Sequence, residues 1–228
     1  MTIFKYALKR GFTNPTALVF NCAFPIILMI VMRGEGLGEQ GPFLIALALM
    51  FGGFFMAKGI QNDRMEGVLL RILSGPVTMR NYLFQNLLGA VVPMVGLSIA
   101  IGALGIALHD WELTFAIGIT LCYSFLAATS VGLSFVWSSL FKSKEAGTGA
   151  FSAAMTLIAA VSGFFVPLNL MPDVLFYIGA LFPAHWASRA IQTLIDYGEF
   201  TQMYWISLLA MFLFAAAYVL FGAKRRLI

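Results

Sequence analysis

The feature that most constrains this chain is a series of long apolar segments, each about as long as a bilayer-spanning helix. Crossing about 30 Å of hydrocarbon takes roughly 20 apolar residues in a helix. Because a water-soluble domain of 228 residues could not bury a chain that is 61% hydrophobic, these segments predict an all-α membrane protein. The six predicted transmembrane helices are 15–32, 42–60, 82–108, 113–141, 146–166 and 203–222, and together they form one transmembrane domain over 1–228.

The basic residues predict the orientation of these helices, because Lys and Arg near membrane ends are retained on the cytoplasmic side. With both termini inside, 12 of the 14 basic residues lie in inner segments, and only Arg33 and Arg189 lie outside. The net charge is then +9 inside and −5 outside, which agrees with the formal charge of +4. We predict a multi-pass protein of the plasma membrane with cytoplasmic termini, and its positive charge requires no nucleic-acid partner.

The inner loop between the second and third predicted spans contains a short amphipathic segment. Its apolar residues recur at i, i+3, i+4, i+7 and i+8, and the pattern stops before Pro76. Such a helix is too short to cross the bilayer, so we expect it on the membrane surface or against another protein. Its apolar face consists of Met65, Val68, Leu69, Ile72 and Leu73.

The N-terminal residues 2–13 place Phe4, Leu8 and Phe12 at every fourth position, with Lys5 and Lys9 on a neighbouring strip. This pattern favours an N-terminal interfacial helix. A plain basic flank of the first span is an equally good interpretation of the same residues.

The outer segment 167–202 is long but is not typical of a loop. A nine-residue apolar run, 174–182, lies between Pro172 and Pro183 and is too short to span. A second helical pattern follows Pro183. We predict an outer re-entrant helical hairpin between the fifth and sixth spans, because irregular backbone at membrane depth must be shielded by protein.

Several kinds of chemistry are excluded by what the sequence lacks. No G-x-x-x-x-G-K-[ST] motif is present, so the chain is not expected to be an enzyme that hydrolyses nucleotides. The two histidines, His109 and His185, are far apart and predict interfacial positions rather than a metal site. The predicted spans contain no acidic residue, which disfavours an ion-coupled carrier.

Two motifs resemble the permease subunits of type-2 ABC exporters. One looks like that family's acid-Gly-Thr-Leu stretch ending in Pro, with Val68 in place of the usual Thr. The other is similar to the family's series of Gly-x-x-x-Pro, Leu-Pro and Asn-Pro around its outer helices. In this chain the motifs read Glu66-Gly67-Val68-Leu69 through Pro76, and Gly163 through Pro167 followed by Met171-Pro172 and Phe182-Pro183.

The resemblance implies six spans, and it implies that 62–75 is a coupling helix that docks into a separate ABC ATPase subunit. It also implies a second permease chain, identical or not, and export rather than import. ATP and Mg would be bound by the ATPase partner, and this chain would bind no cofactor. The coupling residues are predicted to be Asp63, Arg64, Glu66, Gly67, Leu70 and Arg71, and the outer re-entrant region is marked by Pro167, Pro172 and Pro183.

The sequence therefore predicts a subunit that exports a hydrophobic or amphipathic compound, such as a drug, antibiotic or peptide. Asn21, Phe24 and Phe55 are candidate pathway residues because they lie near the middle of the first two spans. A lipid or polysaccharide exporter would use the same scaffold. A membrane assembly protein without transport activity is the competing hypothesis from another functional class, since a fold does not name its function.

Overall fold

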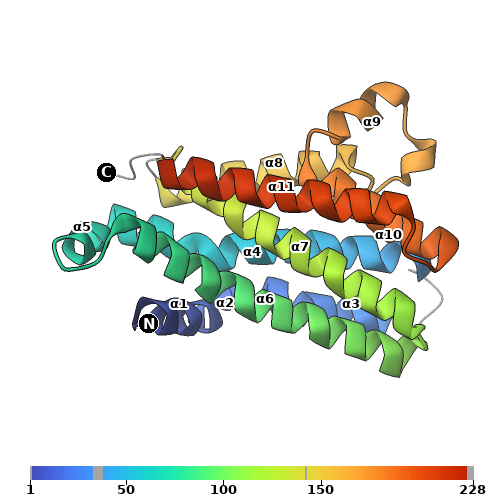
Figure 1. The fold of residues 1–228 in the computed structure, drawn as a ribbon, viewed down its shortest axis with the longest axis horizontal. Helices are drawn as coiled ribbons and strands as arrows, with labels where there is room; N and C mark the ends of the chain where they lie inside the picture. The colour runs from blue at the N-terminus through green and yellow to red at the C-terminus, as the bar shows by residue number, and fades with distance from the viewer. Residues whose placement is uncertain (1, 33–37, 142, 225–228) are drawn as a thin grey trace.

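The computed structural model describes residues 2–32, 38–141 and 143–224 (Figure 1). Every regular element in these ranges is a helix, as the sequence predicts. Arg33, one of the two basic residues placed outside, lies beyond the described residues. The helices are α1 (Thr2–Thr13), α2 (Pro15–Leu18), η1 (Val19–Ala23), α3 (Phe24–Met32), η2 (Gly38–Gln40), α4 (Gly41–Met65), α5 (Val68–Leu73), α6 (Met79–His109), α7 (Leu113–Ser138), α8 (Lys144–Val161), η3 (Leu168–Leu170), α9 (Asp173–Gly179), α10 (Pro183–Tyr197) and α11 (Gln202–Lys224).

Five helical stretches within the described ranges are long and apolar enough to cross a membrane. They match five of the six predicted spans, with ends that differ by a few residues. Side chains cap the starts of several of these helices. At the start of α6, for example, the Thr78 side-chain oxygen accepts a hydrogen bond from the Asn81 amide. The five are Pro15–Met32, Gly41–Met65, Met79–His109, Leu113–Trp137 and Gln202–Gly222.

The predicted span 146–166 corresponds to α8, which is not among those five. α8 has 18 residues and begins with Lys144 and Glu145, so its first turn is polar. It ends at Val161, because the chain leaves the helix at Gly163, whose φ is 94°. The predicted end at residue 166 is therefore wrong by about one turn.

The first span is interrupted in its middle. The π-helical η1 separates α2 from α3, and the Phe24 amide bonds to the carbonyl of Val19, five residues earlier. Pro25 follows at once and has no N–H to continue the regular i→i−4 pattern. The apolar pattern of the sequence predicts one continuous helix here, because a single wide turn leaves that pattern almost unchanged.

α7 is the central helix, with contacts to α4, α6, α10 and α11. Small residues allow its close approach to α4. The Ser130 hydroxyl donates to the Met50 carbonyl. A Cβ at Gly53 would lie 2.6 Å from the Ser130 oxygen, so a larger residue there would separate the two helices.

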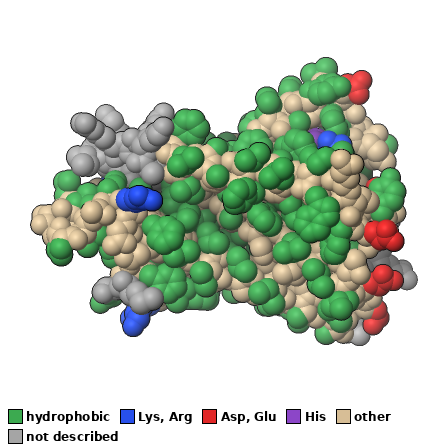
Figure 2. Space-filling model, viewed as in Figure 1, with side chains coloured by type: hydrophobic (Ala, Val, Ile, Leu, Met, Phe, Trp, Pro, Cys, Tyr) green, Lys and Arg blue, Asp and Glu red, His purple; other side chains and the backbone are tan. Residues whose placement is uncertain are grey.

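The two ends of the bundle differ in charge, with a hydrophobic surface between them (Figure 2). We call the end with α1, α5 and the start of α8 the basic end, and the end with α10 and the α6–α7 turn the acidic end. The described C-terminal part of α11 also lies at the basic end (Figure 1). The basic end carries Lys9, Arg10, Arg64, Arg71, Arg80 and Lys144, and the acidic end carries Asp110, Glu112, Asp173, Asp196 and Glu199.

Candidate coupling site

The predicted coupling helix 62–75 is two elements rather than one. α4 continues to Met65, the chain turns at Gly67 with φ of 71°, and α5 begins at Val68. Glycine adopts this left-handed conformation without steric cost, and a continuous helix cannot contain it. Asp63 and Arg64 therefore belong to the last turn of α4, one of the helices long and apolar enough to span a membrane.

The exposed part of this site is the turn itself and one face of α5. Leu70 is 57% exposed, while Leu69 beside it is 2% exposed and packs into the core. Arg71 and Glu66 are also exposed. Within the predicted set, Glu66, Leu70 and Arg71 are thus the side chains that the fold leaves open to a partner.

Glu66 is bridged to the start of α8. The Lys144 ammonium lies 2.5 Å from a Glu66 carboxylate oxygen and donates a hydrogen bond to it. This hydrogen bond and the charge of Lys144 hold the pKa of the Glu66 carboxyl below its ordinary value. The start of α8 therefore contributes to the same surface, and Lys144 is a residue that sequence reasoning missed.

Asp63, one of the predicted coupling residues, is bonded within the bundle. Arg10 Nη1 donates to Asp63 Oδ1 at 2.7 Å, and the Tyr82 hydroxyl donates to Asp63 Oδ2 at 2.5 Å. Arg10 Nη2 also donates to Asn86 Oδ1 at 3.1 Å. The Asp63 side chain is 13% exposed, and its two bonds join α1, α4 and α6.

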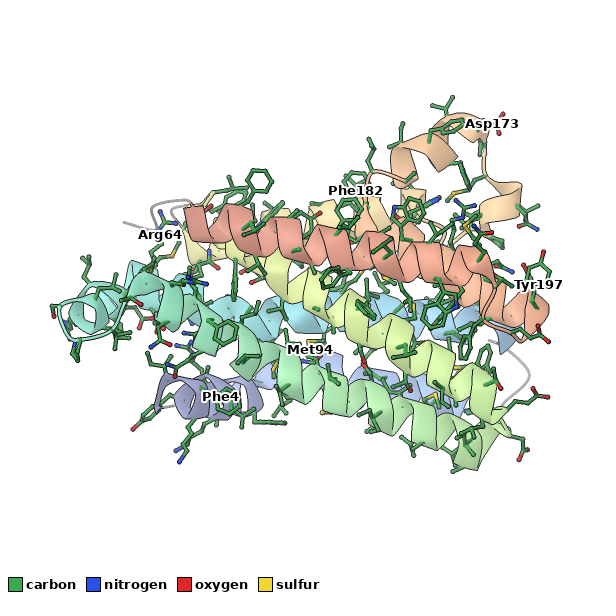
Figure 3. The ribbon with its side chains drawn as sticks, viewed as in Figure 1. Phe4, Arg64, Met94, Asp173, Phe182 and Tyr197 are labelled. Carbon is green, nitrogen blue, oxygen red and sulfur yellow. The ribbon has the colours of Figure 1, made fainter. Side chains whose placement is uncertain are left out.

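The same network fixes the N-terminal helix. The Arg10 guanidinium lies against Gly59 of α4, where a Cβ would come within 2.1 Å of it. Phe4 lies nearer the N-terminal end of α1 (Figure 3). Its amide donates a hydrogen bond to Gln85 Oε1 of α6 at 3.1 Å. The apolar and basic strips of 2–13 predict the helix, but Arg10 pairs with a residue 53 positions away, and no local pattern indicates that partner.

Two of the three predicted pathway residues, Phe24 and Phe55, pack against the same ring, that of Phe20. Phe24 is 38% exposed, whereas Phe55 is 6% exposed and stacks on Phe20, with 5.3 Å between ring centroids. Asn21 is buried, and its Nδ2 donates to the Gly52 carbonyl at 3.4 Å. Asn21 also lines an apolar cavity of about 360 Å³ between the first span and α6.

The three prolines predicted to mark the segment 167–202 each lie at the start of a helix. Pro167 precedes η3, Pro172 precedes α9, and Pro183 is the first residue of α10. The apolar run 174–182 is helical only as far as Gly179, because the chain must turn before Pro183. α9 projects from the rest of the bundle (Figure 1).

His185, which the sequence predicts at an interfacial position, is buried inside the protein. Its side chain has no exposed surface, and neither ring nitrogen has a hydrogen-bond partner among the described residues. Burial and the nearby charge of Arg189 lower its pKa to about 4, so the ring is neutral at pH 7. No group of three potential metal ligands occurs in the part of the chain that the structure describes.

Comparison with known proteins identifies the family. The comparison with curated proteins gives no match. A model of the ABC-2 family transporter protein matches residues 41–224, which includes the α4–α5 turn and every later helix described above. Members of this family are membrane subunits that associate with an ABC ATPase and generally have no nucleotide site of their own. This match agrees with the apolar helices described above, and the chain therefore belongs to the ABC-2 transporter family.

Proposed function

We propose that this chain is the transmembrane subunit of an ATP-driven exporter and that it moves a hydrophobic or amphipathic compound out of the cell. One observation carries the proposal: the exposed α4–α5 turn is continuous with a buried spanning helix. A partner that displaces this turn would displace α4, since contacts that differ between two states bias their equilibrium. ATP and Mg are assigned to the partner ATPase.

The proposed topology has six crossings, with α8 as the fifth. Lys144 at the start of α8 pairs with Glu66 at the basic end, and a Cβ at Gly179, near the acidic end, would lie 2.3 Å from the carbonyl of Val161, the last residue of α8. The helix thus extends between the two ends. Its 18 residues would be about 27 Å long at 1.5 Å per residue, close to the hydrocarbon thickness. The short α9 and α10 then form the re-entrant hairpin, with the basic end in the cytoplasm.

Labelling of single cysteines tests this topology. In a Cys22→Ala, Cys122→Ala background, an impermeant maleimide applied to intact cells is expected to label Glu199→Cys and not Ser143→Cys. Both variants should react after the membrane is permeabilised, which provides the control. If both positions react in intact cells, α8 does not cross and the six-helix topology is wrong.

A second permease chain is part of the proposal. The first span is exposed along much of α3, where Ile26, Ile27 and Ile30 are 45%, 55% and 61% exposed. This apolar face suits lipid or another copy of the transmembrane domain. Phe24 lies on the same helix and is the candidate pathway residue best placed to face a second chain.

The apolar chemistry also fits a lipid as cargo. A polysaccharide exporter or a membrane assembly protein without transport activity would use the same scaffold.

The coupling proposal is tested with the ABC ATPase that co-purifies with the native chain. Glu66→Arg is expected to lower both ATPase binding and efflux of a hydrophobic dye by about tenfold, because it reverses a charge on the docking surface. Lys144→Glu breaks the same ion pair from the other side. The swap Glu66→Lys, Lys144→Glu restores the pair but not the polarity of the surface.

If Glu66 contacts the ATPase, the double variant should remain defective in efflux. If the ion pair is purely structural, the double variant should recover wild-type efflux. Glu199→Arg, an equal charge reversal at the acidic end, is the matched control and should retain efflux. Wild-type efflux in Glu66→Arg at equal expression would contradict the coupling assignment. Failure of the native chain to capture any ABC ATPase would contradict the proposed function as a whole.

A further inference from the structure

A pocket of about 740 Å³ lies at the acidic end between η3, α9, α10 and α11. Its volume is within the range of small-molecule sites. One part of its lining is polar, with Arg189, Gln192 and Thr201, and another part is apolar, with Phe176 and Ile206. The labelled residues Asp173 and Tyr197 lie in this region of Figure 3. The pocket is separate from the coupling site at the opposite end.

Arg189 is the one formally charged residue in the lining. Its guanidinium carbon lies 5.6 Å from the ring centroid of Phe176 and 5.7 Å from that of Trp186, so two aromatic rings hold it in place. No carboxylate of residues 2–32, 38–141 and 143–224 lies within 4.0 Å of it. The nearby Asp196 instead accepts a hydrogen bond from Gln192 at 2.8 Å.

In the described part of the chain no ion pair to Arg189 is found, and the histidine packed nearby is neutral. His185 packs edge-on against Phe176, with centroids 4.8 Å apart, and its lowered pKa keeps it neutral. A half-buried guanidinium with several N–H donors is best satisfied by a carboxylate or phosphate, which it can bind with two hydrogen bonds. The apolar residues of the same pocket offer a surface to an attached hydrocarbon chain.

We infer that this pocket binds an amphiphile with an anionic head group, with the head group on Arg189 and the apolar chain along Phe176, Met203 and Ile206. A bilayer phospholipid and a transported anionic compound share this chemistry. The inference concerns binding by the chain alone, so it does not depend on the proposed export activity or on the ATPase.

The test uses the full chain in phosphatidylcholine nanodiscs, with Trp186 as the reporter next to Arg189. Trp111, Trp137 and Trp205 are replaced by Phe, and a minor fraction of the lipid carries brominated acyl chains that quench tryptophan. Brominated phosphatidylglycerol is expected to quench Trp186 about threefold more than brominated phosphatidylcholine. Arg189→Gln should remove this difference, and Arg80→Gln, which loses one positive charge at the basic end, should keep it.

Two further arms separate the possible sources of the ligand. Dodecyl phosphate, a water-soluble anionic amphiphile, is expected to reverse the extra quenching, while inorganic phosphate at the same concentration is not. If dodecyl phosphate has no effect, the pocket is specific for a two-chain lipid, which retains the inference and excludes a single-chain cargo. If inorganic phosphate reverses the quenching fully, the site binds a free anion, and the amphiphile assignment is overturned.

Equal quenching by the two lipids in the starting protein would overturn the inference, as would an undiminished difference in Arg189→Gln. Arg189→Lys is the control for misfolding of Arg189→Gln. It keeps the charge but not the planar guanidinium, so part of the difference should remain.

Discussion

The basic end of this bundle has a network of polar side chains that joins three helices, and the acidic end has none among the described residues, although Gln61 Nε2 and Asn62 Oδ1 at the basic end also have no hydrogen-bond partner there. At the basic end, Arg10, Asp63, Tyr82 and Asn86 bond to one another across three helices. At the acidic end, Ser162, His185 and Ser188 are fully buried, yet their side-chain polar atoms have no hydrogen-bond partner among the described residues. The first arrangement stabilises one geometry, because breaking it would leave a buried charge unpaired.

This difference indicates where the molecule is able to rearrange. Unpartnered buried polar atoms cost free energy, so a conformation or ligand that satisfies them would be favoured. The short helices η3, α9 and α10 lie next to these atoms and to the pocket at Arg189. We therefore expect the basic end to move as a rigid unit with α4 and the acidic end to change its internal packing.

Two glycines with positive φ give the sharpest comparison of the two ends. Gly163 has φ of 94°, and a Cβ there would lie 2.5 Å from Leu168 Cδ2 and 2.6 Å from Ser188 Oγ. Gly163→Ala is therefore expected to lower the free energy of unfolding by about 3 kcal/mol, from backbone strain and overpacking together. Thermal unfolding of the purified protein in detergent measures the change.

Gly67→Ala is the matched variant at the basic end. Gly67 has φ of 71°, but a Cβ there meets nothing within 4 Å, so only backbone strain of about 1 kcal/mol is expected. If the two variants lose the same free energy of unfolding, the side chains around Gly163 rearrange to accommodate a Cβ, which would contradict the expected overpacking.

Arg10→Ala tests the junction at the basic end. The substitution leaves Asp63 with Tyr82 as its remaining partner and leaves Asn86 Oδ1 without its donor. We expect the free energy of unfolding to fall by about 2 kcal/mol. This is less than the loss of a fully buried ion pair would cost, because Arg10 is partly exposed. Lys9→Ala is the control, since Lys9 is exposed on the same helix. A loss no larger than that of the control would show that the network does not hold α1 in place.

A pH series tests the acidic end. The pKa of His185 falls from 6.5 to about 4 on folding, so between these values the unfolded chain binds more protons than the folded chain. Stability should therefore be complete above pH 6.5 and decrease as the pH falls toward 4, by roughly 1 kcal/mol at pH 5. Unfolding midpoints at pH 7.5 and pH 5 measure the decrease.

His185→Gln should reduce the difference between these two midpoints, and His109→Gln should retain it. An unchanged difference in His185→Gln would assign the pH dependence to other groups.

The coupling residues show how far sequence reasoning extends at the site. The spacing of Met65, Val68, Leu69, Ile72 and Leu73 predicts an amphipathic helix, but it does not reveal the break at Gly67. Asp63 and Glu66 look equivalent as acids in an inner loop. Asp63 is paired with Arg10 and shielded, whereas Glu66 is exposed and paired with Lys144. These partners are 53 and 78 residues away, so no local pattern predicts them.

The sequence by itself determined the all-helical membrane class, the positions of five spans and the difference in charge between the ends. These properties depend on local hydropathy and on the order of residues, because the bilayer acts on each segment separately. The tertiary structure alone decided the π-turn in the first span, the early end of α8, the burial of His185 and the unpaired Arg189 between two rings. Each of these depends on which distant segments pack together, and packing is a property of the whole chain.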